Sequence, residues 1–145
     1  MPVVDARDDF LRARRGYHAT RTARLLGGRR GRRVPRTLGD VAGLPQRSAR
    51  LEVIPLAEIV GTVEPTVTFD ARFRPASELV RRRWERIALA HRKGVPLPPI
   101  RVLQSDDGYY VVDGRHRVSV ALALGYPDID AYVTRVGAMS SSVAA

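Results

Sequence analysis

The chain has 145 residues, of which 44% are hydrophobic, so it is long enough for one compact domain with its own core. It contains no cysteine, which excludes a disulfide framework, a thiolate metal site and a thiol nucleophile. No apolar run approaches the roughly 18 residues of a membrane span, and the N-terminal residues do not resemble a secretory signal. We therefore expect a cytoplasmic protein that does not contact a membrane.

The net charge of +10 is concentrated in the first third of the chain. Residues 1–50 hold 13 arginines and 4 aspartates, a net charge of +9, whereas the remaining residues carry +1. A dense arginine segment attracts DNA, RNA or other acidic partners. It is equally typical of a solvated basic tail, and charge alone does not separate these two interpretations.

The first 48 residues are predicted to form a basic, partly helical extension. A weak apolar stripe at helical spacing covers residues 5–26, and two glycines predict its end. The run 29–33 is expected to be a flexible basic segment, and a short helix is predicted over 37–42. We place the domain boundary near residue 48, and expect a domain over 49–137 and a disordered tail over 138–145.

The pattern of a folded unit begins after the boundary. Period-two alternation predicts strands over 51–54 and 129–136, and a hairpin of strands 100–103 and 109–112 joined by a turn over 105–108. Residues 56–60 suggest a short turn or helix, and residues 62–75 a long loop. Helices are expected over 77–93 and 118–124. Together these elements predict an α/β fold, a small mixed sheet with packed helices.

The helix over 77–93 has a clear apolar face and clear ends. Ser77 is placed to cap its first turn, and Gly94 suits its end. Trp84 and His91 lie on the apolar face, so we expect Trp84 in the core and His91 at its edge.

The turn after residue 112 carries the most specific chemistry. Asp113 and Gly114 follow a strand, and the three basic residues Arg115, His116 and Arg117 open the next helix. Cations are unfavourable at a helix N-terminus, because they oppose the helix dipole there. A bound anion would offset that cost, and the free backbone N–H groups of a first helical turn bind anions well. Each side chain taken alone also fits a structural role, but the group favours an anion site.

Five segments resemble the ParB-like nuclease/sulfiredoxin superfamily: residues 54–56, 59–61, 69–73, 98–100 and 112–121. The most specific of them is the Asp-Gly-x-His-Arg turn with its following apolar helix. The resemblance implies that this turn binds nucleotide phosphates. Members of the superfamily include CTP-dependent DNA clamps, ATP-using reductases and ADP-dependent small-molecule kinases, so CTP, ATP or ADP, with Mg²⁺ carried by the nucleotide, are the implied ligands.

Departures from the family patterns narrow the expected activity. Arg115 stands where a sulfiredoxin has its catalytic cysteine, so reductase activity is not expected. The clamps have a Gly-Glu-Arg-Arg turn and a following helix-turn-helix domain, which the residues after 136 leave no room for. The related free-serine kinase has a similar turn and takes its base from the loop after the first strand. Glu64 is the nearest counterpart here, and Asp70 is the second.

We therefore expect a nucleotide-binding protein whose catalytic status is open. Residues 113–117 together with Arg72 and Arg74 are the candidate phosphate ligands, and Glu64, Asp70 and His116 are the candidate catalytic residues. No spacing suggests a metal held by the protein alone. The alternatives are a nucleotide-dependent phosphotransferase or nuclease that uses the same pocket, and a non-catalytic DNA-binding regulator. A homodimer also stays open.

Overall fold

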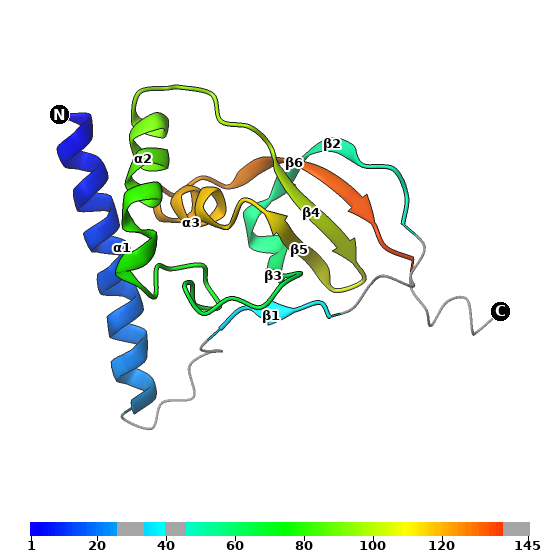
Figure 1. Cartoon of the computed structure of the whole chain (residues 1–145), viewed down its shortest axis with the longest axis horizontal. Helices are drawn as coiled ribbons and strands as arrows, with labels where there is room; N and C mark the ends of the chain where they lie inside the picture. Colours follow the sequence, from blue (N-terminus) through cyan, green and yellow to red (C-terminus); the bar gives the residue numbers. More distant parts are fainter. Residues whose placement is uncertain (26–33, 40–45, 138–145) are drawn as a thin grey trace.

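The computed structural model describes residues 1–25, 34–39 and 46–137 (Figure 1). In chain order these residues form α1 (Pro2–Leu25), β1 (Arg36–Thr37), β2 (Arg50–Pro55), the 3-10 turn η1 (Leu56–Glu58), β3 (Ile59–Thr62), the 3-10 turn η2 (Glu78–Val80), α2 (Arg81–Arg92), β4 (Ile100–Ser105), β5 (Gly108–Asp113), α3 (Arg115–Ala123) and β6 (Asp128–Arg135).

The strands form one mixed sheet in the order β1-β3-β5-β4-β6-β2. The pairs β4/β5 and β2/β6 are antiparallel, and the other neighbours are parallel. Ser105 pairs with Gly108 across a tight turn, as the sequence predicted for this hairpin. Pro55 is tolerated in β2 because this strand lies at the edge of the sheet. The predicted α/β class with a small mixed sheet is confirmed.

Helix α3 lies between the sheet and the other two helices, and this position explains its apolar sequence (Figure 1). Val118 and Ala121 belong to the core cluster formed with the sheet. Val120 belongs to a second cluster, which it shares with residues of α1 and α2. The buried Trp84 of α2 donates its Nε1–H to Ser119 Oγ at 2.8 Å, so α2 is fixed to α3 by a hydrogen bond as well as by packing. The sequence prediction of a core Trp84 is confirmed.

Helix α1 packs along α2 through one aromatic contact and one ion pair. The Phe10 ring meets Trp84 edge-on, with ring centroids 5.6 Å apart. Asp9, only 1% exposed, accepts hydrogen bonds at 3.0 and 2.7 Å from Nε and Nη2 of Arg92. Residues that were predicted as an extension therefore supply part of the second core, and β1 supplies an edge strand of the sheet.

Most of the other predicted elements are present with small shifts. β2, β6 and α2 lie where they were expected, Ser77 Oγ accepts from the Leu79 N–H at 3.1 Å, and His91 is half-buried against Tyr126. Helix α3 begins at Arg115, so Arg115, His116 and Arg117 open it as predicted, and the apolar helix expected over 118–124 is its continuation. Strand β3 was not predicted, and the helix expected over 37–42 is wrong at Thr37, which pairs in β1. The basic run 29–33, residues 40–42 and the tail 138–145 lie outside the described residues.

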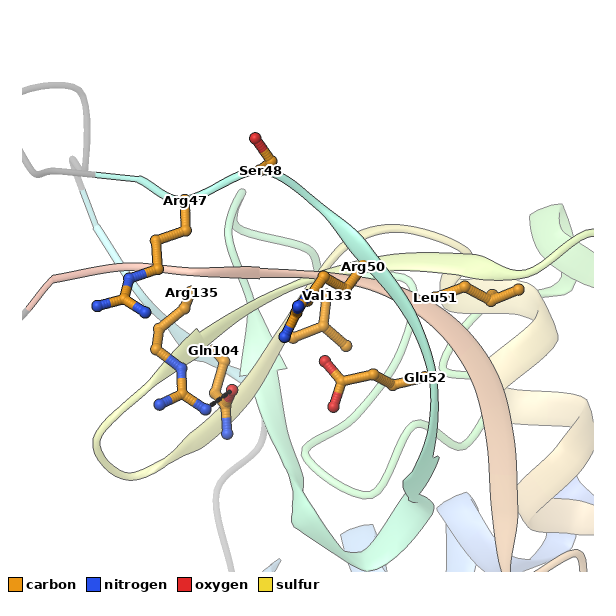
Figure 2. A pocket seen from close by; sticks show the side chains of 8 residues that line it. All are labelled: Arg47, Ser48, Arg50, Leu51, Glu52, Gln104, Val133 and Arg135. Atoms are coloured by element: carbon orange, nitrogen blue, oxygen red, sulfur yellow. Dashed lines mark hydrogen bonds between the residues drawn. The ribbon is translucent and has the colours of Figure 1, made fainter.

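The helices cover only part of the inner face of the sheet. Val133 belongs to the core with α3, and Arg135 follows it two residues later on the same face. Here, next to the end of the β4–β5 hairpin, a cavity of about 710 Å³ opens between β2, β4 and β6 (Figure 2). Position Asp113, where β5 leads into α3, lies at the opposite end of the hairpin.

Candidate anion-binding site at the N-terminus of helix α3

A sharp turn at Gly114 joins β5 to α3. Gly114 has φ 116°, and a Cβ at this position would lie 2.4 Å from Cγ2 of Ile100, so only glycine fits without displacement. The first helical bond runs from the Val118 N–H to the Gly114 carbonyl at 2.9 Å. The N–H groups of residues 115–117 therefore have no carbonyl acceptor within the helix, and no side chain of the described residues caps them. This is the backbone geometry that binds anions.

A cavity of about 240 Å³ adjoins this helix N-terminus. It is lined by Arg83, Ile87, Val112, Asp113, Gly114, Arg115, His116 and Arg117. Asp113, Gly114, Arg115, His116 and Arg117, all predicted as ligands from the sequence, are thus brought together around one space. Within the described part of the chain, neither Arg83 nor Arg115 forms an ion pair. Their guanidinium groups are available to an anion in this cavity.

Arg83 was missed in the sequence analysis. It comes from α2 and lies beside Ile87, one helical turn later, which lines the same cavity. Neighbouring positions of α2, Trp84 and Ala88, face the core. No local pattern marks Arg83, because its place at the site depends on the packing of α2 against α3.

Arg117 has a bracing role, the structural alternative that the sequence analysis left open for it. Its Nη1 donates to the carbonyl oxygens of Pro98 and Pro99 at 2.7 and 2.9 Å, and its Nη2 pairs with Asp113 Oδ2 at 3.1 Å. The guanidinium group thus ties the entry to β4 to the end of β5 and to the first turn of α3. Asp113 and Arg117 hold the shape of the turn, while Arg115 and Arg83 remain free of such contacts in the described structure.

His116 is a neutral imidazole at physiological pH. Its ring packs edge-on against Phe69, with centroids 5.1 Å apart. Burial lowers the pKa of His116, and the nearby Arg83, Arg115 and Arg117 lower it further, to about 4. The imidazole can donate one hydrogen bond and accept another in this state. The lowered pKa thus reflects burial of the ring first and the surrounding arginines second.

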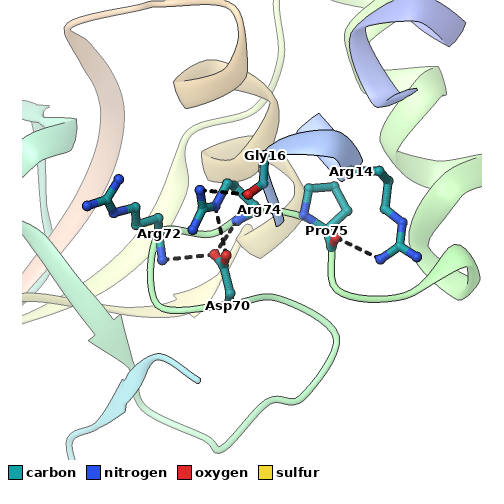
Figure 3. Close-up of polar contacts among 6 residues, drawn as sticks. All are labelled: Arg14, Gly16, Asp70, Arg72, Arg74 and Pro75. Atoms are coloured by element: carbon teal, nitrogen blue, oxygen red, sulfur yellow. Dashed lines mark hydrogen bonds and ion pairs between the residues drawn. The ribbon is translucent and has the colours of Figure 1, made fainter. Parts of the chain in front are cut away.

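The loop that carries the candidate ligands Arg72 and Arg74 is held by a buried carboxylate (Figure 3). Asp70 is 1% exposed, and its Oδ1 accepts from the backbone N–H groups of Arg72 and Arg74 at 2.9 and 2.8 Å. Its Oδ2 accepts from Arg74 Nε at 2.7 Å, and Arg74 Nη1 donates to the Gly16 carbonyl of α1 at 3.1 Å. Asp70 and Arg74 therefore have structural partners, and neither lines the cavity at α3.

Two further candidates also lie away from the cavity at α3. The side chain of Arg72 lines a separate cavity of about 300 Å³ between α1, the 70–74 loop and α3. Glu64 is exposed in the loop after β3 and does not line the α3 cavity. Of the three candidate catalytic residues, only His116 lies at the candidate site. The sequence could have indicated a structural role for Asp70, since an aspartate side chain often accepts hydrogen bonds from the backbone N–H groups that follow it in a turn.

Several sequence expectations concern parts that the structure leaves out. Because the arginine run 29–33 lies outside the described residues, contact with DNA or RNA through this run stays a prediction.

Within the described residues, no cluster of three or more His, Asp or Glu side chains is arranged to hold a metal ion. No described helix combines the length and apolar character needed to cross a membrane.

Comparison with known proteins gives a structural similarity but no match to a family model or a curated protein. Among solved structures, the sulfiredoxin from Arabidopsis thaliana is similar, with a TM-score of 0.45 and 22% sequence identity. This similarity covers 66% of the present chain and 94% of the sulfiredoxin chain. Assignment of a function therefore depends on the side chains of this chain itself.

Proposed function

We propose that the protein binds a nucleoside diphosphate or triphosphate, as a member of the ParB/sulfiredoxin superfamily. In this proposal the phosphates lie at the N-terminus of α3, bound by the N–H groups of residues 115–117 and by the side chains of Arg115 and Arg83. One observation carries it: among the described residues, two guanidinium groups that form no ion pair border the same cavity as a helix N-terminus without a side-chain cap.

The charge balance of the site supports a phosphate ligand. Three arginines and the positive end of the α3 dipole lie close together, and Asp113 is the one carboxylate among the residues that line the cavity. Two or more negative charges on a phosphate chain would offset this excess, and guanidinium groups bind phosphate through paired, charge-assisted hydrogen bonds. Mg²⁺ would enter with the nucleotide, held by its phosphate oxygens.

The same residues argue against two specific reactions. The chain contains no cysteine, and Arg115 stands at the position of the turn where a sulfiredoxin has its catalytic cysteine. We therefore do not propose the sulfur chemistry of a sulfiredoxin. Phosphoryl transfer needs a group that positions or deprotonates the acceptor, and of the candidates Glu64, Asp70 and His116 only His116 lines the cavity. The proposal is therefore nucleotide binding, without an assigned transfer step.

Calorimetric titration of CTP, ATP and ADP, each with Mg²⁺, tests the proposal on the full chain. We expect at least one nucleotide to bind with a Kd below about 1 mM, and Arg115→Gln to weaken binding roughly ten-fold, because one charge-assisted contact is lost. Arg86→Gln is the matched control, since Arg86 is an exposed arginine of α2 that does not line the cavity.

Two results would contradict the proposal. The first is no binding of any of the three nucleotides at millimolar concentration. The second is an equal loss of affinity in Arg115→Gln and Arg86→Gln, which would indicate general charge attraction rather than a site.

A further inference from the structure

A second group of basic side chains lines the cavity at the other end of the sheet. We call this cavity the sheet-end pocket, and it is lined by Arg47, Ser48, Arg50, Leu51, Glu52, Gln104, Val133 and Arg135 (Figure 2). Gln104 pairs with Tyr109 in the β4–β5 hairpin, four residues before Asp113, so about 13 Å of strand separates the pocket from the turn at α3. The two cavities share no lining residue.

Three arginines reach the sheet-end pocket, two from the segment that leads into β2 and one from β6. Arg47 precedes β2, Arg50 begins β2, and Arg135 ends β6. Their backbone is fixed, because the Arg47 N–H donates to the Arg135 carbonyl at 3.1 Å and Arg50 pairs with Val133 in the sheet. None of the three forms an ion pair within the described residues, which leaves their charge uncompensated apart from Glu52.

The pocket also holds neutral and acidic groups that would select the ligand. Gln104 Oε1 accepts from Arg135 Nη2 at 3.1 Å and thereby orients that guanidinium group. The buried side chain of Val133 provides an apolar floor. Arg50 and Glu52 project from the same side of β2 toward this floor (Figure 2). Glu52 would repel a second anionic group and accept a hydrogen bond from a hydroxyl group.

We propose that the sheet-end pocket binds a small hydroxylated organic anion. A phosphate or carboxylate group contacts Arg47, Arg50 and Arg135, the carbon chain lies on Val133, and a hydroxyl group donates to Glu52. A continuous nucleic-acid backbone fits less well, because its successive phosphates would approach the Glu52 carboxylate. This proposal does not depend on nucleotide binding at α3.

The test is a nuclear magnetic resonance titration of the ¹⁵N-labelled full chain with three probes. Glycerol 3-phosphate carries both required groups, glycerate replaces the phosphate by a carboxylate, and inorganic phosphate lacks the hydroxylated carbon chain. We expect saturable shifts of the Gln104 and Arg135 amide signals, with roughly ten-fold tighter binding of glycerol 3-phosphate or glycerate than of inorganic phosphate. The tighter of the two organic probes identifies the anionic group.

Variants then separate the site from general charge attraction. Arg50→Gln is expected to raise the Kd about ten-fold. Arg86→Gln makes an equal change of charge at an exposed position of α2 and is expected to leave the Kd unchanged. Glu52→Ala, which removes the hydrogen-bond acceptor, should remove the preference for the hydroxylated probes. All these positions are exposed, and an otherwise unchanged amide spectrum verifies that each variant is folded.

Three outcomes would overturn the proposal. They are shifts that grow linearly without saturation, an equal loss of affinity in Arg50→Gln and Arg86→Gln, and saturable shifts that are confined to residues 114–117. The last outcome would assign the probe to the turn at α3, so it would support the proposed function while removing the sheet-end site.

Discussion

His116 couples the charge of the candidate site to the stability of the fold. Its pKa in the folded protein is about 4, chiefly because of burial, whereas the unfolded chain has the ordinary histidine value of about 6.5. The unfolded state therefore binds the proton first as the pH falls. The free energy of unfolding therefore falls as the pH is lowered from about 6.5 to about 4. Above this range the titration of His116 does not change the free energy of unfolding.

We predict that this loss disappears in His116→Gln. Between pH 7 and pH 4.5, wild type should lose about 1–2 kcal/mol more of its free energy of unfolding than the variant, after allowance for solvent screening of a half-buried ring. Urea unfolding of both proteins across this range measures the difference. All other ionisable groups are common to the two proteins, so the difference between the two pH profiles isolates His116. Parallel pH profiles would show that His116 is not the group responsible.

At the scale of elements, the β5–α3 turn needs a glycine at position 114 for two separate reasons. Gly114 has a positive φ, and Ile100 fills the space where a Cβ would stand. Gly125, just after α3, has φ 80°, but a Cβ added there would meet no heavy atom within 4 Å. The two positions thus separate backbone strain from steric overlap.

We predict that Gly114→Ala lowers the free energy of unfolding by about 3–4 kcal/mol, since strain and overlap add. Gly125→Ala should cost about 1 kcal/mol, because only the strain remains. Urea midpoints of the two variants provide the comparison. Equal losses would mean that Ile100 moves aside freely and that the turn is less rigid than its packing suggests.

At the scale of the whole molecule, α1 is part of the fold and not a detachable arm. Phe10 is fully buried against Trp84, whereas the next residue, Leu11, is 39% exposed on the same helix. We predict that Phe10→Ala lowers the free energy of unfolding by about 3–4 kcal/mol and alters the Trp84 fluorescence of the folded state. Leu11→Ala should cost less than about 1 kcal/mol. Similar small losses in both variants would show that α1 docks weakly.

The features that sequence predicted well are those with a local cause. The hairpin, the Ser77 cap and the apolar α3 follow from turn chemistry, capping and periodicity, which a single segment contains. Strand β3 is short and follows a 3-10 turn directly, so no periodic pattern marks it. The position of α1 depends on Phe10 and Asp9 meeting partners in α2 some eighty residues later, which periodicity does not reveal.

The residues of the candidate site also divide into those that local sequence predicted and those that depend on tertiary packing. The turn at Gly114 and the basic first turn of α3 were predictable, because helix N-termini and glycine have known local chemistry. Arg117 is a candidate ligand through its place in the basic cluster, and its hydrogen bonds to the main-chain carbonyls of Pro98 and Pro99 leave no mark in a side-chain pattern. Arg83 enters only through the packing of two helices.

The pairing of β2 with β6 has a consequence for the order in which this chain folds. β2 lies at the edge of the sheet and its neighbour there is β6, about seventy residues further along the chain. During synthesis β2 must therefore wait, with Leu51 and Val53 unpaired, until β6 has left the ribosome. Closing so long a loop is entropically costly, so sheet completion is a late step, and the incomplete chain presents an open strand to chaperones.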